Sequence, residues 1–509
     1  AEAAMRTACD LDPHAIQPRL FLARIYMLAG KRDEAEKVYA ALKTVAPDKP
    51  SAYMALAQFY LSVGDKEKAL AEFRSLSTSK PADASIKSRM VETLIDMGRN
   101  KEADEINQEI LRKGSGDPDA LVASGRMLIA AHSYHEAVTT LQKAIKSNPK
   151  SAVAYYYLGV AQQALASPDV AKSSFARALE LQPQMTTASV ALANLQAKTG
   201  NGEEALRLAD RTLKKNPASA PALLARAQGL IAKGDLKEAE AVLKEVLRQD
   251  PSSLPALAQL LKLSVSQGRP QEAMQRIAEA AKQHPQDARL HVLLAAGYFS
   301  LKDLKNSEAS VRQAIALDPK VPNAYTLLAD IDFSKGSPEQ AEKDLRTAID
   351  VDPNSLQNYT VLGIRYENTG RWDDAKKLFA KAHEIDPNSP MVAVELAYLY
   401  LDHGGDVNVA ASLAQVAQKS LPNSPAPADA LGWAYYKMGT TETAIHELEG
   451  AVRMAPNTPL YQYHLGMAYL AARRFGPATK SLESALKQDP KSIWAPNIRT
   501  ALHEAAGKT

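Results

Sequence analysis

Prolines recur along this chain at a fixed spacing of 34 residues. The register holds at Pro13, Pro47, Pro81, Pro149, Pro183, Pro217, Pro251, Pro285, Pro319, Pro353 and Pro387 and, after a one-residue insertion, at Pro422, Pro456 and Pro490. Ser115 occupies the one slot of that register without proline. A period between about 20 and 50 residues is typical of repeat arrays. The spacing therefore predicts one small unit repeated along all 509 residues, in place of separate globular domains.

A second slot of the repeat supports the same period. It holds a small residue in every copy: Ala35, Ala69, Ala103, Ala137, Ala171, Ala205, Ala239, Ala273, Ser307, Ala341, Ala375, Ala410, Ala444 and Ala478. Small residues are needed where two helices cross closely, and a proline cannot continue the helix before it. We therefore expect each unit to contain a first helix (helix A), a turn that often carries glycine, a second helix (helix B) and a short link that ends in proline.

Residues 354–387 carry the most complete version of this pattern. Leu362-Gly363 is followed by Tyr366, then by Ala375, Phe379, Ala382 and Pro387. This spacing resembles the tetratricopeptide repeat (TPR). The resemblance covers essentially the whole chain, and it implies an all-α solenoid, a right-handed superhelix of antiparallel helix pairs. Gly370 lies between the two helices, where we expect a left-handed turn residue.

The slots divide the chain into three parts. Residues 1–13 fit the second helix of a truncated repeat, residues 14–490 fit fourteen repeats, and residues 491–509 fit a C-terminal capping helix. We expect a kink or slack at the irregular link 113–118, which lacks its proline. The insertion near 404–405 lengthens one turn between helices A and B, either without consequence or as a contact loop. The chain begins within a repeat, so we expect it to be a fragment of a longer protein or a protein whose N-terminal part has been removed.

Composition excludes several classes of function. The net charge is only +3, which argues against a nucleic-acid partner. Cys9 is the single cysteine, so no disulfide framework or thiolate metal cluster is expected. No stretch approaches the roughly 18 apolar residues of a transmembrane helix.

Sequence signatures of catalysis are missing. The chain contains no H-E-x-x-H, G-x-S-x-G or C-x-x-C motif. His132 and His135 lie three residues apart at a turn without a third ligand nearby, and a solvated turn explains them better than a metal site. We therefore predict a non-enzymatic protein with no catalytic, cofactor-binding or metal-binding residues.

The TPR resemblance implies a concave groove lined by helix A. Two known binding modes of the family are not matched: carboxylate-clamp slots hold residues such as Leu20 and Met54, and asparagine-ladder slots hold residues such as Ala55 and Ala123. Instead, aromatic and acidic residues gather in the C-terminal half. The candidate partner-binding residues are Phe299, Asp330, Phe333, Glu367, Glu395, Tyr398, Asp402, Asp429, Trp433, Tyr436, Tyr463 and Met467. Aromatic anchors often dominate binding, and acidic neighbours favour a basic or neutral segment. The alternative is that several of these rings only pack between neighbouring A helices.

The function implied by the resemblance is a scaffold that binds a protein or peptide partner in its groove. Residues 430–436 (ALGWAYY) and 463–469 (YHLGMAY) also resemble the C-terminal end of bacterial exopolysaccharide-secretion TPR proteins of the PEP-CTERM type. That resemblance implies a bacterial secretion or envelope assembly and a periplasmic or envelope-associated location. The alternative is a substrate-recruiting arm of a larger enzyme, such as a glycosyltransferase, whose catalytic domain lies outside this chain. The sequence leaves the partner's identity, the compartment and the oligomeric state open.

Overall fold

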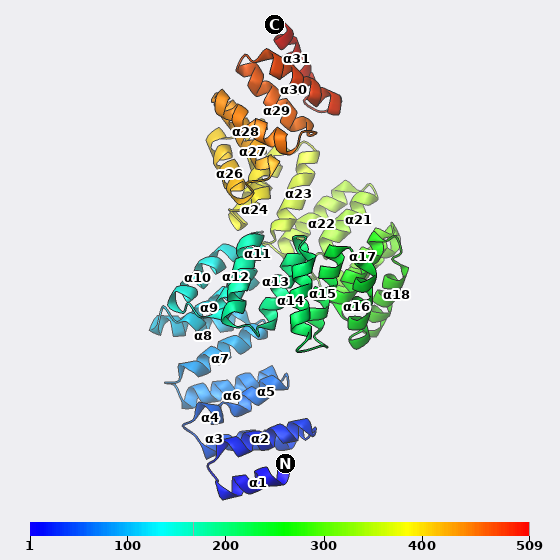
Figure 1. Cartoon of the computed structure of the whole chain (residues 1–509). Coiled ribbons are helices and arrows are strands. Elements are labelled where there is room, and N and C mark those ends of the chain that lie inside the picture. Colours follow the sequence, from blue (N-terminus) through cyan, green and yellow to red (C-terminus); the bar gives the residue numbers. More distant parts are fainter. Residues whose placement is uncertain (166, 508–509) are drawn as a thin grey trace. The chain divides into compact units, whose positions relative to one another are not determined.

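The computed structural model describes residues 1–165 and 167–507 (Figure 1). Within this part the chain forms 31 α-helices and no β-strand, which confirms the all-α class. No helix described there has the length and uninterrupted apolar character that a bilayer crossing requires.

Helices alternate between the two types predicted from the repeat. The A helices are α2 (Ile16–Leu28), α4 (Pro50–Tyr53) with α5 (Ala55–Ser62), α7 (Ala84–Asp96), α9 (Pro118–Ala130), α11 (Ala152–Ala164), α13 (Thr186–Lys198), α15 (Ala220–Lys233), α17 (Leu254–Ser266), α19 (Ala288–Ser300), α21 (Ala324–Ser334), α23 (Leu356–Asn368), α25 (Pro390–Asp402), α27 (Pro425–Lys437), α29 (Pro459–Ala471) and α31 (Ala495–Ala506). The B helices are α1 (Glu2–Leu11), α3 (Arg32–Val45), α6 (Lys66–Ser79), α8 (Asn100–Lys113), α10 (Tyr134–Ser147), α12 (Pro168–Leu181), α14 (Gly202–Leu213), α16 (Leu236–Gln249), α18 (Gln271–Gln283), α20 (Leu304–Leu317), α22 (Pro338–Val351), α24 (Trp372–Ile385), α26 (Val407–Ser420), α28 (Thr441–Met454) and α30 (Phe475–Gln488).

The chain divides into two compact units. One comprises Ala1–Gln162 and Ser173–Ala188, and the other comprises Gln163–Lys172 and Ser189–Thr509. In the first unit, helices α1 to α10 pack on one another in chain order, and in the second, helices α14 to α31 do the same. Each unit thus buries its apolar surface mainly between successive helices, as a solenoid does.

The small-residue slot lies at the closest helix crossings. All of its members, from Ala35 to Ala478 and including Ser307, are fully buried. Gly363 shows how tight a crossing is, because a Cβ atom built there would lie 2.8 Å from Cε2 of Phe379. The Phe379 ring is itself fully buried, so it has little room to move away.

Glycine is needed at the turn between helices A and B because the backbone there is left-handed. The predicted turn glycines all have a φ between 70° and 87°: Gly30, Gly64, Gly98, Gly200, Gly234, Gly268, Gly336, Gly370, Gly404 and Gly439. The expectation for Gly370 is therefore confirmed. Where glycine is absent from this slot, His132, Lys302 and Arg473 still adopt φ values of 60–62°, a conformation that L-residues with a Cβ rarely take.

The tyrosine of the L-G-x-x-Y pattern joins successive repeats. Its hydroxyl on helix A donates a hydrogen bond to the preceding helix B: Tyr26 to Glu2 over 3.1 Å, Tyr60 to Glu36 over 2.8 Å, Tyr366 to Glu342 over 2.8 Å and Tyr469 to Glu449 over 2.6 Å. At Tyr435 the direction reverses, and Gln415 donates to the hydroxyl over 3.2 Å. We name this contact the tyrosine link.

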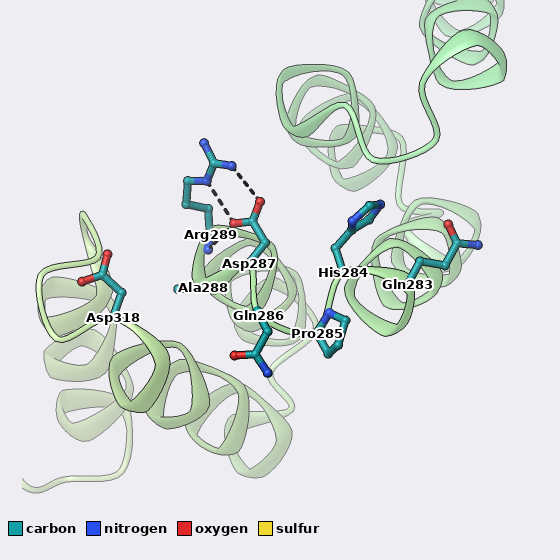
Figure 2. Close-up of a pocket in the computed structure, with 8 residues that line it drawn as sticks. All are labelled: Gln283, His284, Pro285, Gln286, Asp287, Ala288, Arg289 and Asp318. Atoms are coloured by element: carbon teal, nitrogen blue, oxygen red, sulfur yellow. Dashed lines mark hydrogen bonds and ion pairs between the residues drawn. The ribbon is translucent and has the colours of Figure 1, made fainter. Parts of the chain in front are cut away.

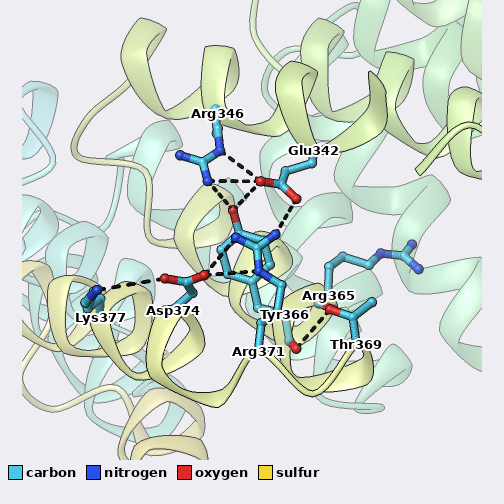
Figure 3. Close-up of polar contacts among 8 residues, drawn as sticks. All are labelled: Glu342, Arg346, Arg365, Tyr366, Thr369, Arg371, Asp374 and Lys377. Carbon is cyan, nitrogen blue, oxygen red and sulfur yellow. Dashed lines mark hydrogen bonds and ion pairs between the residues drawn. The ribbon is translucent and has the colours of Figure 1, made fainter. Parts of the chain in front are cut away.

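The tyrosine link of Tyr366 lies in a larger polar network (Figure 3). The Tyr366 hydroxyl accepts from Nη2 of Arg346 over 2.7 Å, and Arg371 binds both Glu342 and Asp374. The guanidinium of Arg371 also lies 3.9 Å from the centre of the Tyr366 ring. The charges of this network are therefore paired within the protein.

One repeat carries a buried carboxyl pair in place of this link. Asp332 of α21 occupies the tyrosine slot and lies close enough to Asp344 of α22 to interact electrostatically, and both are buried. Burial and the neighbouring carboxyl raise the pKa of Asp344 to about 6. Gln340 donates to Oδ1 of Asp344 over 3.1 Å.

Specific side chains hold the two irregular connections. At link 113–118, Asp117 caps α9 by accepting from the backbone N–H of Ala120, and Asn107 of α8 donates to the carbonyl of Ala120 and to Ser124. At the longer turn 403–406, Nζ of Lys376 donates to the carbonyls of His403 and Gly404 over 3.0 and 3.1 Å. Both connections are thus tied to a neighbouring helix.

Candidate partner-binding site

Three consecutive A helices of the second unit bring polar and aromatic residues together. Helix α27 contacts both α25 and α29, which places Tyr398, Asp429 and His464 side by side although about one repeat separates each from the next in sequence. We call Glu367, Glu395, Tyr398, Asp429, Tyr461 and His464 the acidic cluster.

Asp429 forms the centre of the acidic cluster. Its side chain is fully buried, and its Oδ2 accepts from the Tyr398 hydroxyl over 2.8 Å. The same oxygen lies 2.7 Å from Nδ1 of His464, which is also fully buried. Among the described residues, Oδ1 of Asp429 and Nε2 of His464 receive no hydrogen bond. Burial and the Asp429 carboxylate raise the pKa of Tyr398 well above its usual value.

Trp433 packs directly over this pair. Its indole stacks on His464 and on Tyr436, with ring centroids 4.0 and 4.6 Å apart. Its Nε1 donates to Oδ1 of Asp402 over 2.8 Å. Only 4% of Trp433 is exposed, and Tyr463 beside it is also buried. These two aromatic rings therefore contribute to packing between helices, the alternative that the sequence left open.

Two glutamates extend the acidic cluster along successive A helices. Glu367 of α23 and Glu395 of α25 are partly buried. Burial and the charge of Glu395 together raise the pKa of Glu367 to about 7, and burial raises the pKa of Glu395. Burial and the carboxylates of Asp429 and Glu395 raise the pKa of Tyr461 to about 12. The side chains of Glu395, Asp429 and Tyr461 are thus close enough to interact electrostatically.

The remaining predicted residues lie apart from this centre. Phe299 packs against the apolar core around α19 to α21. Phe333 is covered by the guanidinium of Arg365, 4.0 Å from its ring centre, and Arg365 pairs with Asp330 over 3.8 Å. Met467 is half-buried beside the core of the last repeats. Their role in partner binding stays a prediction.

The sequence reasoning missed His464 and Tyr461. His464 occupies the slot immediately before the leucine of the L-G pair, the slot that also holds Glu395. In the last four repeats this slot holds Val361, Glu395, Ala430 and His464, so the sequence does place a carboxylate and an imidazole there. Tyr461 gives no comparable signal, because it lies near the start of its helix.

An open pocket lies elsewhere in the second unit (Figure 2). It has a volume of about 620 Å³ and is lined by residues 283–289 and Asp318. Arg289 donates two side-chain hydrogen bonds to Asp287, over 3.0 and 2.7 Å, so these two charges neutralise each other. His291 beside it is buried, with Nε2 3.1 Å from the carbonyl oxygen of Pro285.

Family comparisons agree with the repeat register. Models described as tetratricopeptide repeat match residues 1–59 and 230–297, residues 190–253, 360–425 and 430–493, and residues 50–83, 288–321 and 322–355. A model described as TPR repeat matches residues 125–165. No curated protein matches the chain in sequence.

Solved structures with a similar outline include two multi-repeat proteins. A chain in the crystal structure of the APC/C hetero-tetramer Cut9-Hcn1 is 16% identical, with a TM-score of 0.47 and 99% of each chain covered. Yeast Tom70 is 16% identical with a TM-score of 0.35, covering 77% of this chain and 96% of the other. Neither likeness is close enough to carry an argument about function. The family models together span most of the sequence, and the chain belongs to the tetratricopeptide-repeat family.

Proposed function

We propose that this protein is a non-enzymatic scaffold that binds a segment of another protein along the A helices of its last repeats. The observation that supports this most is the acidic cluster. Its outer members, Glu367, Glu395 and Tyr461, are only partly buried, and their hydrogen-bonding capacity is not used by other described residues. Polar groups that reach solvent and have no partner within the protein are available to a ligand.

A site-specific cross-link tests this proposal. A photoreactive phenylalanine analogue replaces Tyr461 in one sample of the full chain and the exposed Glu483 of α30 in a second. After irradiation in the source cells, we expect a discrete cross-linked partner from position 461 and none from position 483. Cross-links of equal yield from both positions, or from position 483 alone, would contradict binding at this face.

The proposed setting is a bacterial secretion or envelope assembly with a periplasmic or envelope-associated location, supported by the short motifs at residues 430–436 and 463–469. Fractionation of the source cells tests this part separately. Recovery of the protein with the cytoplasm alone would contradict the setting while leaving the scaffold proposal intact.

A further inference from the structure

Two neighbouring carboxylates of the acidic cluster lack a cation. Among residues 1–165 and 167–507, no lysine, arginine or histidine forms an ion pair with Glu367 or Glu395. Glu342, on the helix before Glu367, pairs with both Arg346 and Arg371.

A second observation comes from the buried end of the cluster. The side chain of Asp429 is fully buried, and its Oδ2 accepts from Tyr398, whose hydroxyl is influenced by Glu395 as well. Its other oxygen, Oδ1, has no donor within the described part of the chain. Nε2 of His464, whose Nδ1 lies 2.7 Å from Asp429, likewise has no hydrogen-bond partner there.

Most of the unused oxygens therefore belong to carboxyl groups, those of Glu367, Glu395 and Asp429, which accept hydrogen bonds when ionised. This composition selects for a ligand that carries several donors and a positive charge. A lysine ammonium offers three donors and an arginine guanidinium offers five. Hydrogen bonds between such cations and carboxylates are about twice as strong as neutral ones. A metal ion fits less well, because the described residues contain no group of three or more ligands suitably placed for one.

Building on the proposed scaffold function, we propose that the acidic cluster binds a lysine or arginine side chain of the partner segment. Glu367 and Glu395 form its ion pairs, and Asp429 lies behind them as a buried acceptor. Recognition of a basic residue is then the feature that distinguishes a true partner segment from any other extended peptide.

Selection from a random 12-residue peptide library displayed on phage tests this inference with the full chain. We expect the selected pool to be enriched in lysine or arginine relative to the library. Replacing that residue by glutamine in a selected peptide should weaken binding at least about tenfold, as the loss of a charge-assisted contact predicts. The E367Q/E395Q variant should show the same loss with the unmodified peptide.

The matched control is the E339Q/E483Q variant. It removes two exposed glutamates of the B helices α22 and α30, so the net charge changes equally while the acidic cluster is intact. We expect wild-type affinity from it. Equal weakening in both variants, or selected peptides without enriched basic residues, would overturn the inference but leave the scaffold proposal standing. Failure to enrich any binding peptide would overturn both.

Discussion

The indole of Trp433 lies flat against the imidazole of His464, with centroids 4.0 Å apart and planes inclined by 11°. The imidazole is held in turn by Asp429, and the indole N–H by Asp402. Stacking and hydrogen bonding thus hold the Trp433 ring of α27 against the His464 ring of α29.

Truncating this indole should therefore destabilise the last repeats. We expect Trp433→Ala to lower the free energy of unfolding by about 3–5 kcal/mol, because it removes a large buried side chain. Urea denaturation followed by far-ultraviolet circular dichroism measures the change. Trp433→Phe, which keeps most of the packing, should lose less. An unchanged midpoint for Trp433→Ala would show that the ring is a free surface residue.

The helix crossing at Gly363 predicts a position that rejects even one methyl group. Gly363→Ala should destabilise the protein by about 1–3 kcal/mol, because its Cβ would overlap the buried ring of Phe379. Gly450→Ala on α28 is the control: no atom lies within 4 Å of its new Cβ. It should stabilise by about 0.5–1 kcal/mol through helix propensity. Opposite shifts in the thermal midpoint are the expected result, and shifts of one sign would contradict it.

The tyrosine link can be measured by removing one oxygen atom. Tyr366→Phe keeps the ring and deletes hydrogen bonds to Glu342 and Arg346. We expect a loss of about 1 kcal/mol in stability. Tyr325→Phe, whose hydroxyl is not part of a tyrosine link, serves as the reference in the same urea titration. Equal effects from the two substitutions would mean that the link contributes nothing specific.

Glu367 predicts a pH dependence of stability near neutrality. Its pKa is about 7 in the folded protein and close to 4.5 in the unfolded chain, so the folded state holds the proton more tightly. The contribution of Glu367 to the free energy of unfolding is most favourable below about pH 4.5. It declines as the pH rises towards 7 and stays at its minimum above that. Glu367→Gln should therefore raise the midpoint of urea denaturation at pH 8 and flatten this decline. A variant less stable than wild type at pH 8 would contradict the assignment.

The buried carboxyl of Asp344, beside Asp332, should also make the stability of the protein decline as the pH rises, but over a lower pH range. The pKa of Asp344 is about 6 when folded, compared with 3.8 for a free side chain. The contribution of Asp344 to stability is therefore most favourable below about pH 3.8 and declines up to about pH 6. Asp344→Asn supplies a permanent donor towards Asp332, so we expect thermal melts between pH 4 and 7 to become less dependent on pH. An unaltered profile would contradict the raised pKa of Asp344.

The fold was predictable because each slot carries one physical requirement. The alanine slot, the turn glycines and the L-G-x-x-Y tyrosine each follow from a single close crossing or turn, repeated at a fixed period. Burial of the whole alanine slot and the left-handed turn glycines agree with those predictions.

The candidate site was less predictable, because it depends on pairs of residues from different repeats. Asp429 and His464 are 35 residues apart, and Trp433 and Asp402 are 31 apart. The sequence shows the slot of each residue but not which neighbour its side chain turns towards. Trp433 and Glu395 both lie on A helices. Trp433 is packed and hydrogen-bonded to Asp402, whereas Glu395 has no cation among the described residues.

The tyrosine link is distributed unevenly along the chain. Among the described residues the link forms at Tyr26, Tyr60, Tyr366, Tyr435 and Tyr469. Between Tyr60 and position 298 the slot holds leucine, glutamine or serine: Leu94, Leu128, Gln162, Gln196, Leu230 and Ser264. In a repeat array, the strength of each interface decides how far local melting spreads before it stops. Amide protons of the central repeats should therefore exchange with solvent sooner than those near residue 366. Loss of order would begin mid-chain, and the C-terminal repeats that carry the acidic cluster would keep their structure longest.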